Sequence, residues 1–209
     1  MCGLLLEFSK TKINQKQFKN SLDLLSHRGP DNNSILKINK NLILGHTRLS
    51  IQDLSKFANQ PMIEEEGCSI IFNGEIYNFK KLKKKLLDLG EVFLTSSDTE
   101  VLIKYLKIFG VEGIKKLNGM WAFIFVNHNS GLIIISRDRF GKKPLYYNRS
   151  ENGYIFSSEI KSIFHITKSK RILEKEFLST FVHHTYWPNC SNKTFYKEIL
   201  QVMPGEVIT

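Results

Sequence analysis

Two short segments in the second half of the chain are apolar at every position, and they constrain the fold most. Residues 121–126 (WAFIFV) and 132–135 (LIII) are separated only by the turn-forming residues 127–131. A strand that is apolar on both faces belongs to a sheet that is covered on both sides. The two segments therefore predict paired strands in a sheet that lies between two other layers.

Further strands and helices are predicted on either side of this pair. Strong apolar runs favour strands, and apolar residues at helical spacing favour helices. Residues 97–100 (SDTE) have the capping-box pattern of a helix start. We expect strands at 4–8, 42–51, 69–72, 146–147 and 154–156, and helices at 15–26, 78–89, 98–110 and 174–183. Strands bracketed by helices, with sheets buried on both sides, predict a layered α+β sandwich.

Composition argues against several classes of partner. The net charge of +10 first suggests nucleic acid, but only six of the 30 basic residues are Arg, and they are spread along the chain. Arg reads phosphates and base edges, whereas dispersed Lys is typical of a solvated surface. We therefore expect no nucleic-acid partner. No apolar run approaches a membrane span, and the N-terminus lacks a secretory signal, so we expect no membrane partner and a cytoplasmic location.

The three cysteines call for separate interpretations. Cys2, Cys68 and Cys190 form no C-x-x-C pair, so the sequence predicts neither a disulfide framework nor a metal site. An isolated Cys is usually a small buried core residue. Position two changes this weighting, because removal of Met1 would leave a thiol and a free α-amine on one residue. The reference pKa of that amine, about 7.7–8.0, suits a general base for a thiol of about 8.5.

Eight ordered motifs support the second interpretation of Cys2. They are residues 2–3 (CG), 27–31 (HRGPD), 45–51 (GHTRLSI), 60–61 (QP), 73–78 (NGEIYN), 97–100 (SDTE), 118–123 (NGMWAF) and 137–147 (RDRFGKKPLYY). The series resembles the glutaminase domain of glutamine-hydrolysing asparagine synthetases, the class II glutamine amidotransferases. The resemblance extends over essentially the whole chain, up to residues 203–205 (MPG). It implies a four-layer α/β/β/α sandwich of the N-terminal-nucleophile hydrolase type.

The resemblance also implies roles for individual residues. Cys2 would attack the amide of L-glutamine, Asn73 and Gly74 would form the oxyanion hole, and Arg48 would hold the α-carboxylate. Asp98 would hold the α-ammonium group, and the glutamine pocket would be completed by Leu49, Ser50, Ile51, Gln52 and Glu75. Simpler interpretations stay open: a hairpin turn at Asn73-Gly74, a surface Arg48 and a helix-capping Asp98. We interpret His27 and His46 as structural, because neither has a partner at metal-ligand spacing.

The composition of the chain changes after about residue 165: residues 167–175 are polar and basic, and Pro188 and Pro204 interrupt the rest. Residues 1–165 would form the amidotransferase domain, and 166–209 an arm leading toward a synthetase domain or subunit. The arm's apolar residues would have to pack on the amidotransferase domain or on a missing partner; they are Phe177, Leu178, Phe181, Tyr186, Trp187, Phe195 and Tyr196. The Ser-Gly-Gly-x-Asp-Ser loop of the synthetase half does not occur, and no Walker A or G-x-G-x-x-G motif replaces it. We expect no cofactor for the glutaminase step, and ATP with Mg²⁺ only in a synthetase domain outside this chain.

Three alternatives stay open at this point. The ammonia acceptor is aspartate in an asparagine synthetase, but another acceptor, such as a sugar acid, would leave this part of the sequence unchanged. A catalytically silent regulatory module on the same fold would retain Met1, since a blocked amine removes the base. A homodimer is compatible with the sequence.

Overall fold

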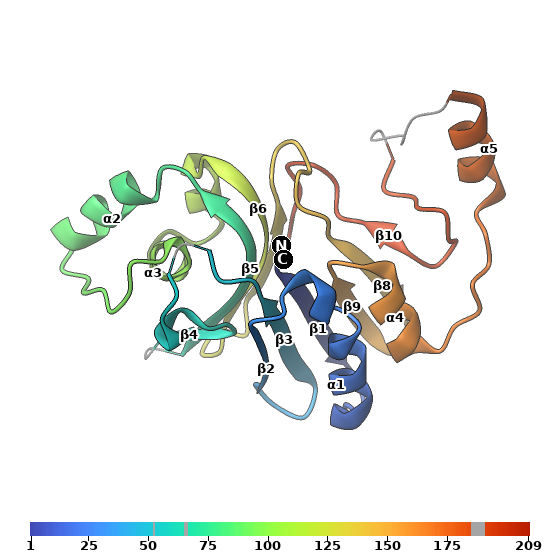
Figure 1. Ribbon diagram of the computed structural model, residues 1–209, viewed down its shortest axis with the longest axis horizontal. Helices are drawn as coiled ribbons and strands as arrows, with labels where there is room; N and C mark the ends of the chain where they lie inside the picture. Colours follow the sequence, from blue (N-terminus) through green and yellow to red (C-terminus); the bar gives the residue numbers. More distant parts are fainter. Residues whose placement is uncertain (52, 65–66, 185–190) are drawn as a thin grey trace.

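Two antiparallel sheets form the centre of the protein (Figure 1). This computed structural model describes residues 1–51, 53–64, 67–184 and 191–209. The first sheet has the order β10-β8-β9-β1-β3-β2: β1 Gly3–Ser9, β2 Asn32–Lys37, β3 Leu42–Arg48, β8 Tyr146–Ser150, β9 Gly153–Ser157 and β10 Leu200–Gln201. The second has the order β11-β7-β6-β5-β4: β4 Met62–Glu64, β5 Cys68–Ile76, β6 Gly119–Asn127, β7 Ile133–Arg137 and β11 Val207–Ile208.

Helices cover the outer faces of both sheets. In Figure 1 the first sheet is flanked by α1 (Gln15–Asp23) and α4 (Ile160–Thr167), and the second by α2 (Phe79–Asp88) and α3 (Asp98–Gly113). A fifth helix, α5 (Lys175–His184), lies apart from these layers at the far right of the view. None of the helices within the described ranges is long and apolar enough to cross a membrane.

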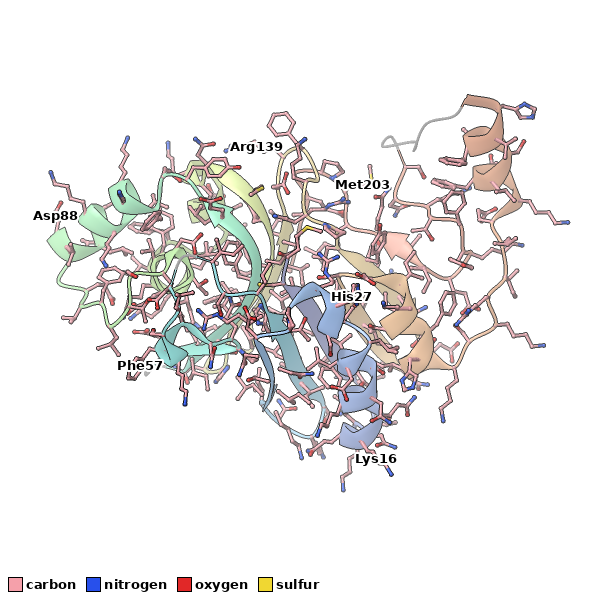
Figure 2. The ribbon with its side chains drawn as sticks, in the orientation of Figure 1. Lys16, His27, Phe57, Asp88, Arg139 and Met203 are labelled. Carbon is pink, nitrogen blue, oxygen red and sulfur yellow. The ribbon has the colours of Figure 1, made fainter. Side chains whose placement is uncertain are left out.

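Three apolar cores separate the four layers. In β1, Leu4 and Leu6 pack between the sheets, whereas Leu5 packs toward α1, because successive side chains of a strand point to opposite faces. In β6, Phe123 and Phe125 contact the core under α3, and Ile124 faces the other sheet. Side chains fill the spaces between the layers throughout (Figure 2). The predicted four-layer α/β/β/α sandwich is therefore confirmed.

Several element boundaries differ from the expectations, among them the end of β5 at Ile76 instead of residue 72 and the end of α3 at Gly113 instead of residue 110. The strand expected to reach residue 51 ends at Arg48, and the chain then becomes an exposed loop. The helix expected over 15–26 ends at Asp23 and is followed by a separate 3-10 turn. The predicted cap of α3 is half formed: Ser97 Oγ accepts from the Glu100 N–H at 3.3 Å, but the Glu100 carboxylate accepts from Leu94 and Thr95 instead of turning back to Ser97.

The stretch predicted as an arm makes contacts with both sheets. Leu200–Gln201 pairs with β8, and Val207–Ile208 pairs with β7. Farther out, the rings of Phe177 and Phe181 stack edge-on against Phe195. Two of the apolar residues named above, Tyr186 and Trp187, lie outside the described residues, as does Cys190. The division of the chain after residue 165 stays a prediction.

Candidate active site

The uncovered edge of β5 forms one wall of the site. Strand β4 pairs with β5 only as far as Ile70, so the backbone groups beyond that point have no strand partner on this side. The Phe72 N–H donates to Gln60 Oε1 at 2.6 Å, and the Ile76 N–H donates to Asp98 Oδ2 at 2.9 Å. Gly74 lies between them with the same strand parity, so its N–H faces the same side. The Gly74 N–H therefore points away from β6 and toward the cavity that Gly74 lines.

Gly74 is required at this position by the closeness of β6. A Cβ atom on Gly74 would lie 2.2 Å from the backbone oxygen of Met120. Asn73 and Gly74 both lie inside β5, paired with Ala122 and Trp121. This pairing excludes the hairpin-turn interpretation of the Asn-Gly dipeptide.

Cys2 lies immediately before β1 and contacts two other segments of the chain. Its backbone N–H donates to Asn73 Oδ1 at 3.1 Å, and its Sγ accepts from the Leu49 N–H at 3.4 Å. Burial raises the pKa of the thiol, while the Leu49 hydrogen bond and nearby positive charges act in the opposite direction. The other half of the Asn73 amide, Nδ2, is buried and has no hydrogen-bond partner in the described structure.

Arg48 is buried at the end of β3 and faces the same cavity. Its Nη1 donates to Ser55 O at 2.9 Å and to Asn59 Oδ1 at 2.6 Å, and its Nη2 donates to Asp53 O. These contacts tie the guanidinium to the loop that follows β3. The surface interpretation of Arg48 is wrong, since only 6% of the residue is exposed.

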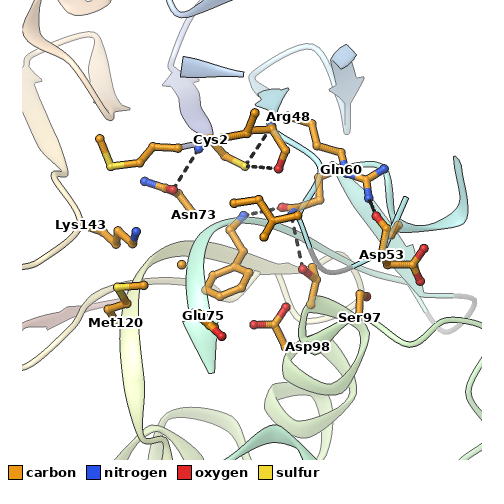
Figure 3. A pocket seen from close by; sticks show the side chains of 17 residues that line it. Cys2, Arg48, Asp53, Gln60, Asn73, Glu75, Ser97, Asp98, Met120 and Lys143 are labelled. Atoms are coloured by element: carbon orange, nitrogen blue, oxygen red, sulfur yellow. Dashed lines mark hydrogen bonds between the residues drawn. The ribbon is translucent and has the colours of Figure 1, made fainter. Parts of the chain in front are cut away.

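Two carboxylates lie on the far side of the cavity from Cys2 (Figure 3). Asp98 is the first residue of α3, and Glu75 follows Gly74 on β5. Burial raises the pKa of Asp98 to about 6, the Ile76 N–H opposes this rise, and the negative charge of Glu75 adds to it. A pair of carboxylates that repel each other favours a bound cation between them.

Most of the predicted site residues meet around one cavity of about 150 Å³. Those that line it are Cys2, Arg48, Leu49, Ile51, Asn73, Gly74, Glu75 and Asp98. Ser50 does not line it; its N–H donates to Asp31 Oδ2 at 2.7 Å. Gln52 lies outside the described residues.

Other residues of the wall had no role assigned from the sequence, among them Gln60, Thr99, Met120 and Lys143. Each lies within or beside one of the motifs, but no pattern of spacing assigned it a role.

The two histidines make local contacts. His46 is fully buried, and its Nε2 lies 3.2 Å from Phe72 O; burial lowers its pKa to about 3. His27 Nε2 lies 2.8 Å from Glu159 Oε1. No group of three or more potential metal ligands occurs in the ranges that the structure describes.

Comparisons with known proteins identify the family of this chain. The family model of the glutamine amidotransferase domain matches residues 1–209. Asparagine synthetase [glutamine-hydrolyzing] 1 of Bacillus subtilis is 34% identical over the whole chain, which covers 33% of that protein. Amidase chry2 of Gibberella zeae is 35% identical over 92% of the chain, covering 28% of that protein. The chain thus spans about a third of the length of these relatives.

A solved structure shares the fold. The glutamine phosphoribosylpyrophosphate amidotransferase of B. subtilis superposes with a TM-score of 0.68 at 22% identity, over 82% of this chain and 45% of that one. The resemblance drawn from the motifs is confirmed by the family model and the relatives. This chain belongs to the glutamine amidotransferase domain family.

Proposed function

We propose that the chain hydrolyses L-glutamine to glutamate and ammonia through Cys2. Removal of Met1 frees the Cys2 amine, which takes the thiol proton directly or through a water. The thiolate forms a C–S bond to the amide carbon, and the C–N bond then breaks as the amine returns the proton to the leaving ammonia. Water hydrolyses the γ-glutamyl thioester, which releases glutamate and regenerates the thiol.

One observation carries this proposal: of the two polar atoms of the Asn73 amide, one has a hydrogen-bond partner in the described structure and the other has none. Oδ1 accepts from the Cys2 nitrogen, whereas Nδ2 is buried without a partner. A buried donor without an acceptor is costly, so it points to an acceptor that forms during the reaction. Nδ2 and the Gly74 N–H together supply the two donors that a tetrahedral oxyanion needs.

The charges around the cavity match the backbone of a free amino acid. The Arg48 guanidinium suits the α-carboxylate of glutamine, which a planar fork of donors binds well. Asp98 and Glu75 suit the α-ammonium group. With its backbone held in this way, glutamine would have its side-chain amide at the Cys2 and Asn73 end of the cavity.

The ammonia is proposed to pass to a synthetase domain or subunit that makes asparagine from aspartate with ATP and Mg²⁺. The similarity to asparagine synthetases supports this acceptor. The similarity to amidase chry2 keeps a different acceptor as the second candidate. We further propose a cytoplasmic protein without a nucleic-acid or membrane partner. A catalytically silent regulatory module stays as the alternative to the glutaminase activity. A homodimer stays as the alternative to a monomer.

The decisive experiment measures ammonia release and the mass of the mature N-terminus together. We expect the chain starting at Cys2 to release ammonia from glutamine, Cys2→Ala to be inactive while folded, and Cys2→Ser to leave at most a trace. Glutaminase activity in a preparation with Met1 fully retained would overturn the mechanism. We also expect no asparagine from aspartate and ATP until a matching synthetase domain is added.

A further inference from the structure

Phe72, two residues before Gly74, has both backbone groups held by side chains instead of by a strand. Its N–H donates to Gln60 Oε1 at 2.6 Å, and its oxygen lies 3.2 Å from His46 Nε2. A carbonyl oxygen only accepts, so His46 carries its proton on Nε2 and donates. The fully buried imidazole is neutral, in keeping with its lowered pKa.

The two side chains come from different parts of the sandwich. His46 lies on β3 of the first sheet and reaches across to β5 of the second. Gln60 lies just before β4, and its Nε2 reaches Thr99 Oγ1 at 3.4 Å, beside Asp98 on α3. Together they fix the edge of β5 to the other sheet and to the helix that holds Asp98.

We propose that His46 and Gln60 are positioning residues for the oxyanion hole, which they align by clamping the backbone of Phe72. The inference rests on the proposed glutaminase activity. Asn73 and Gly74 follow directly on the clamped residue, where β4 no longer supports the strand. A rotation or shift of the edge there would move Asn73 Nδ2 and the Gly74 N–H away from the oxyanion, although neither clamp residue donates to it.

His46 allows a clean test, because it does not line the cavity. His46→Leu removes the donor with an apolar side chain of similar size, and His46→Gln keeps an N–H donor near the Nε2 position. We expect His46→Leu to lower kcat by about 10–100-fold with little change in KM, as misplacement of reacting groups does. His46→Gln should restore most of the loss.

The matched control is His128→Leu. His128 Nε2 lies 2.9 Å from Ser69 Oγ, at the opposite end of β5 from Gly74. Its removal should leave kcat unchanged. Thermal unfolding of each variant, followed by circular dichroism, shows whether a kcat loss accompanies an intact fold.

A second measurement covers the case in which His46→Leu does not fold. Gln60→Met removes the acceptor for the Phe72 N–H, and a γ-aldehyde analogue of glutamine would place its hemithioacetal oxygen in the oxyanion hole. We expect Gln60→Met to lose affinity for the aldehyde by about the same factor as kcat/KM. Wild-type kcat in folded His46→Leu, or wild-type aldehyde affinity in Gln60→Met, would overturn the positioning role. Failure of the wild-type chain to hydrolyse glutamine would instead overturn the proposed function.

Discussion

Asn73 separates catalysis from stability, because the two ends of its amide have different partners. Asn73→Ala removes the acceptor of the Cys2 N–H, a hydrogen bond worth about 0.5–1.5 kcal/mol, but also removes a buried NH₂ group whose lack of a partner costs about 1–3 kcal/mol. The two effects oppose each other, so the free energy of unfolding should lie between about 0.5 kcal/mol below and about 2.5 kcal/mol above that of the wild type. The kcat should fall by about 10²–10³, or about 2.7–4 kcal/mol of transition-state stabilisation.

The assay combines steady-state ammonia release with urea unfolding, and two variants sharpen it. Asn73→Asp keeps an acceptor for the Cys2 N–H but replaces the donor by a carboxylate oxygen, so its kcat should fall at least as far. Asn148→Ala is the control: Asn148 is also buried, but its Nδ2 donates to Glu198 O at 2.8 Å, away from the cavity. It should lose stability and keep kcat. A near-wild-type kcat in Asn73→Asp would refute the oxyanion assignment.

Three further predictions concern the rest of the cavity. Arg48→Lys and Asp98→Asn should chiefly raise KM for glutamine, since each weakens a proposed contact to the substrate backbone that does not change during the reaction. A loss of kcat alone in either variant would contradict its assignment as a substrate-binding residue. Because the pKa of Asp98 is raised to about 6, the KM of the wild type should rise as the pH falls below 6, and the KM of Asp98→Asn should not. The folded state also keeps the Asp98 proton between pH of about 4 and 6, where the unfolded state loses it. The free energy of unfolding of the wild type should therefore fall as the pH rises through that window, and Asp98→Asn should lack this slope. Gly74→Ala should abolish activity and destabilise the fold, since its Cβ would overlap the Met120 oxygen. Unchanged thermal unfolding by circular dichroism, together with unchanged ammonia release, would contradict this by showing that β6 can shift to accept the Cβ.

The sequence predicted the fold well where a pattern has one physical meaning. The segment 121–126 is apolar at every position because β6 faces two cores, and the predicted sandwich follows from that requirement. The end of the strand at Arg48 was missed, because Leu49 and Ile51 continue an apolar pattern although Ile51 is 75% exposed. In the sequence, the apolar residues of this loop beside the cavity have the same pattern as the residues of a strand.

The motifs predicted the residues of the candidate site, but they did not predict the residues that hold the strand β5 in place beside it. Cys2, Asn73 and Asp98 are recognisable because chemistry fixes their residue types. The roles of Gln60 and His46 depend on where β4 stops pairing with β5, which is a matter of sheet topology that no local pattern records. A lone buried His has many structural uses, so its contact with Phe72 could be found only in three dimensions.

The geometry of the site depends on the packing of the two sheets against each other. Cys2 precedes a strand of the first sheet, and Asn73 lies on a strand of the second, 71 positions away. Leu4 and Ile71, each two residues from one of these groups, are fully buried in the core between the sheets. Because such a core is close-packed, it holds the two strands at a fixed offset. The same contacts that stabilise the sandwich therefore set the distance between Cys2, the proposed nucleophile, and Asn73, the proposed oxyanion donor.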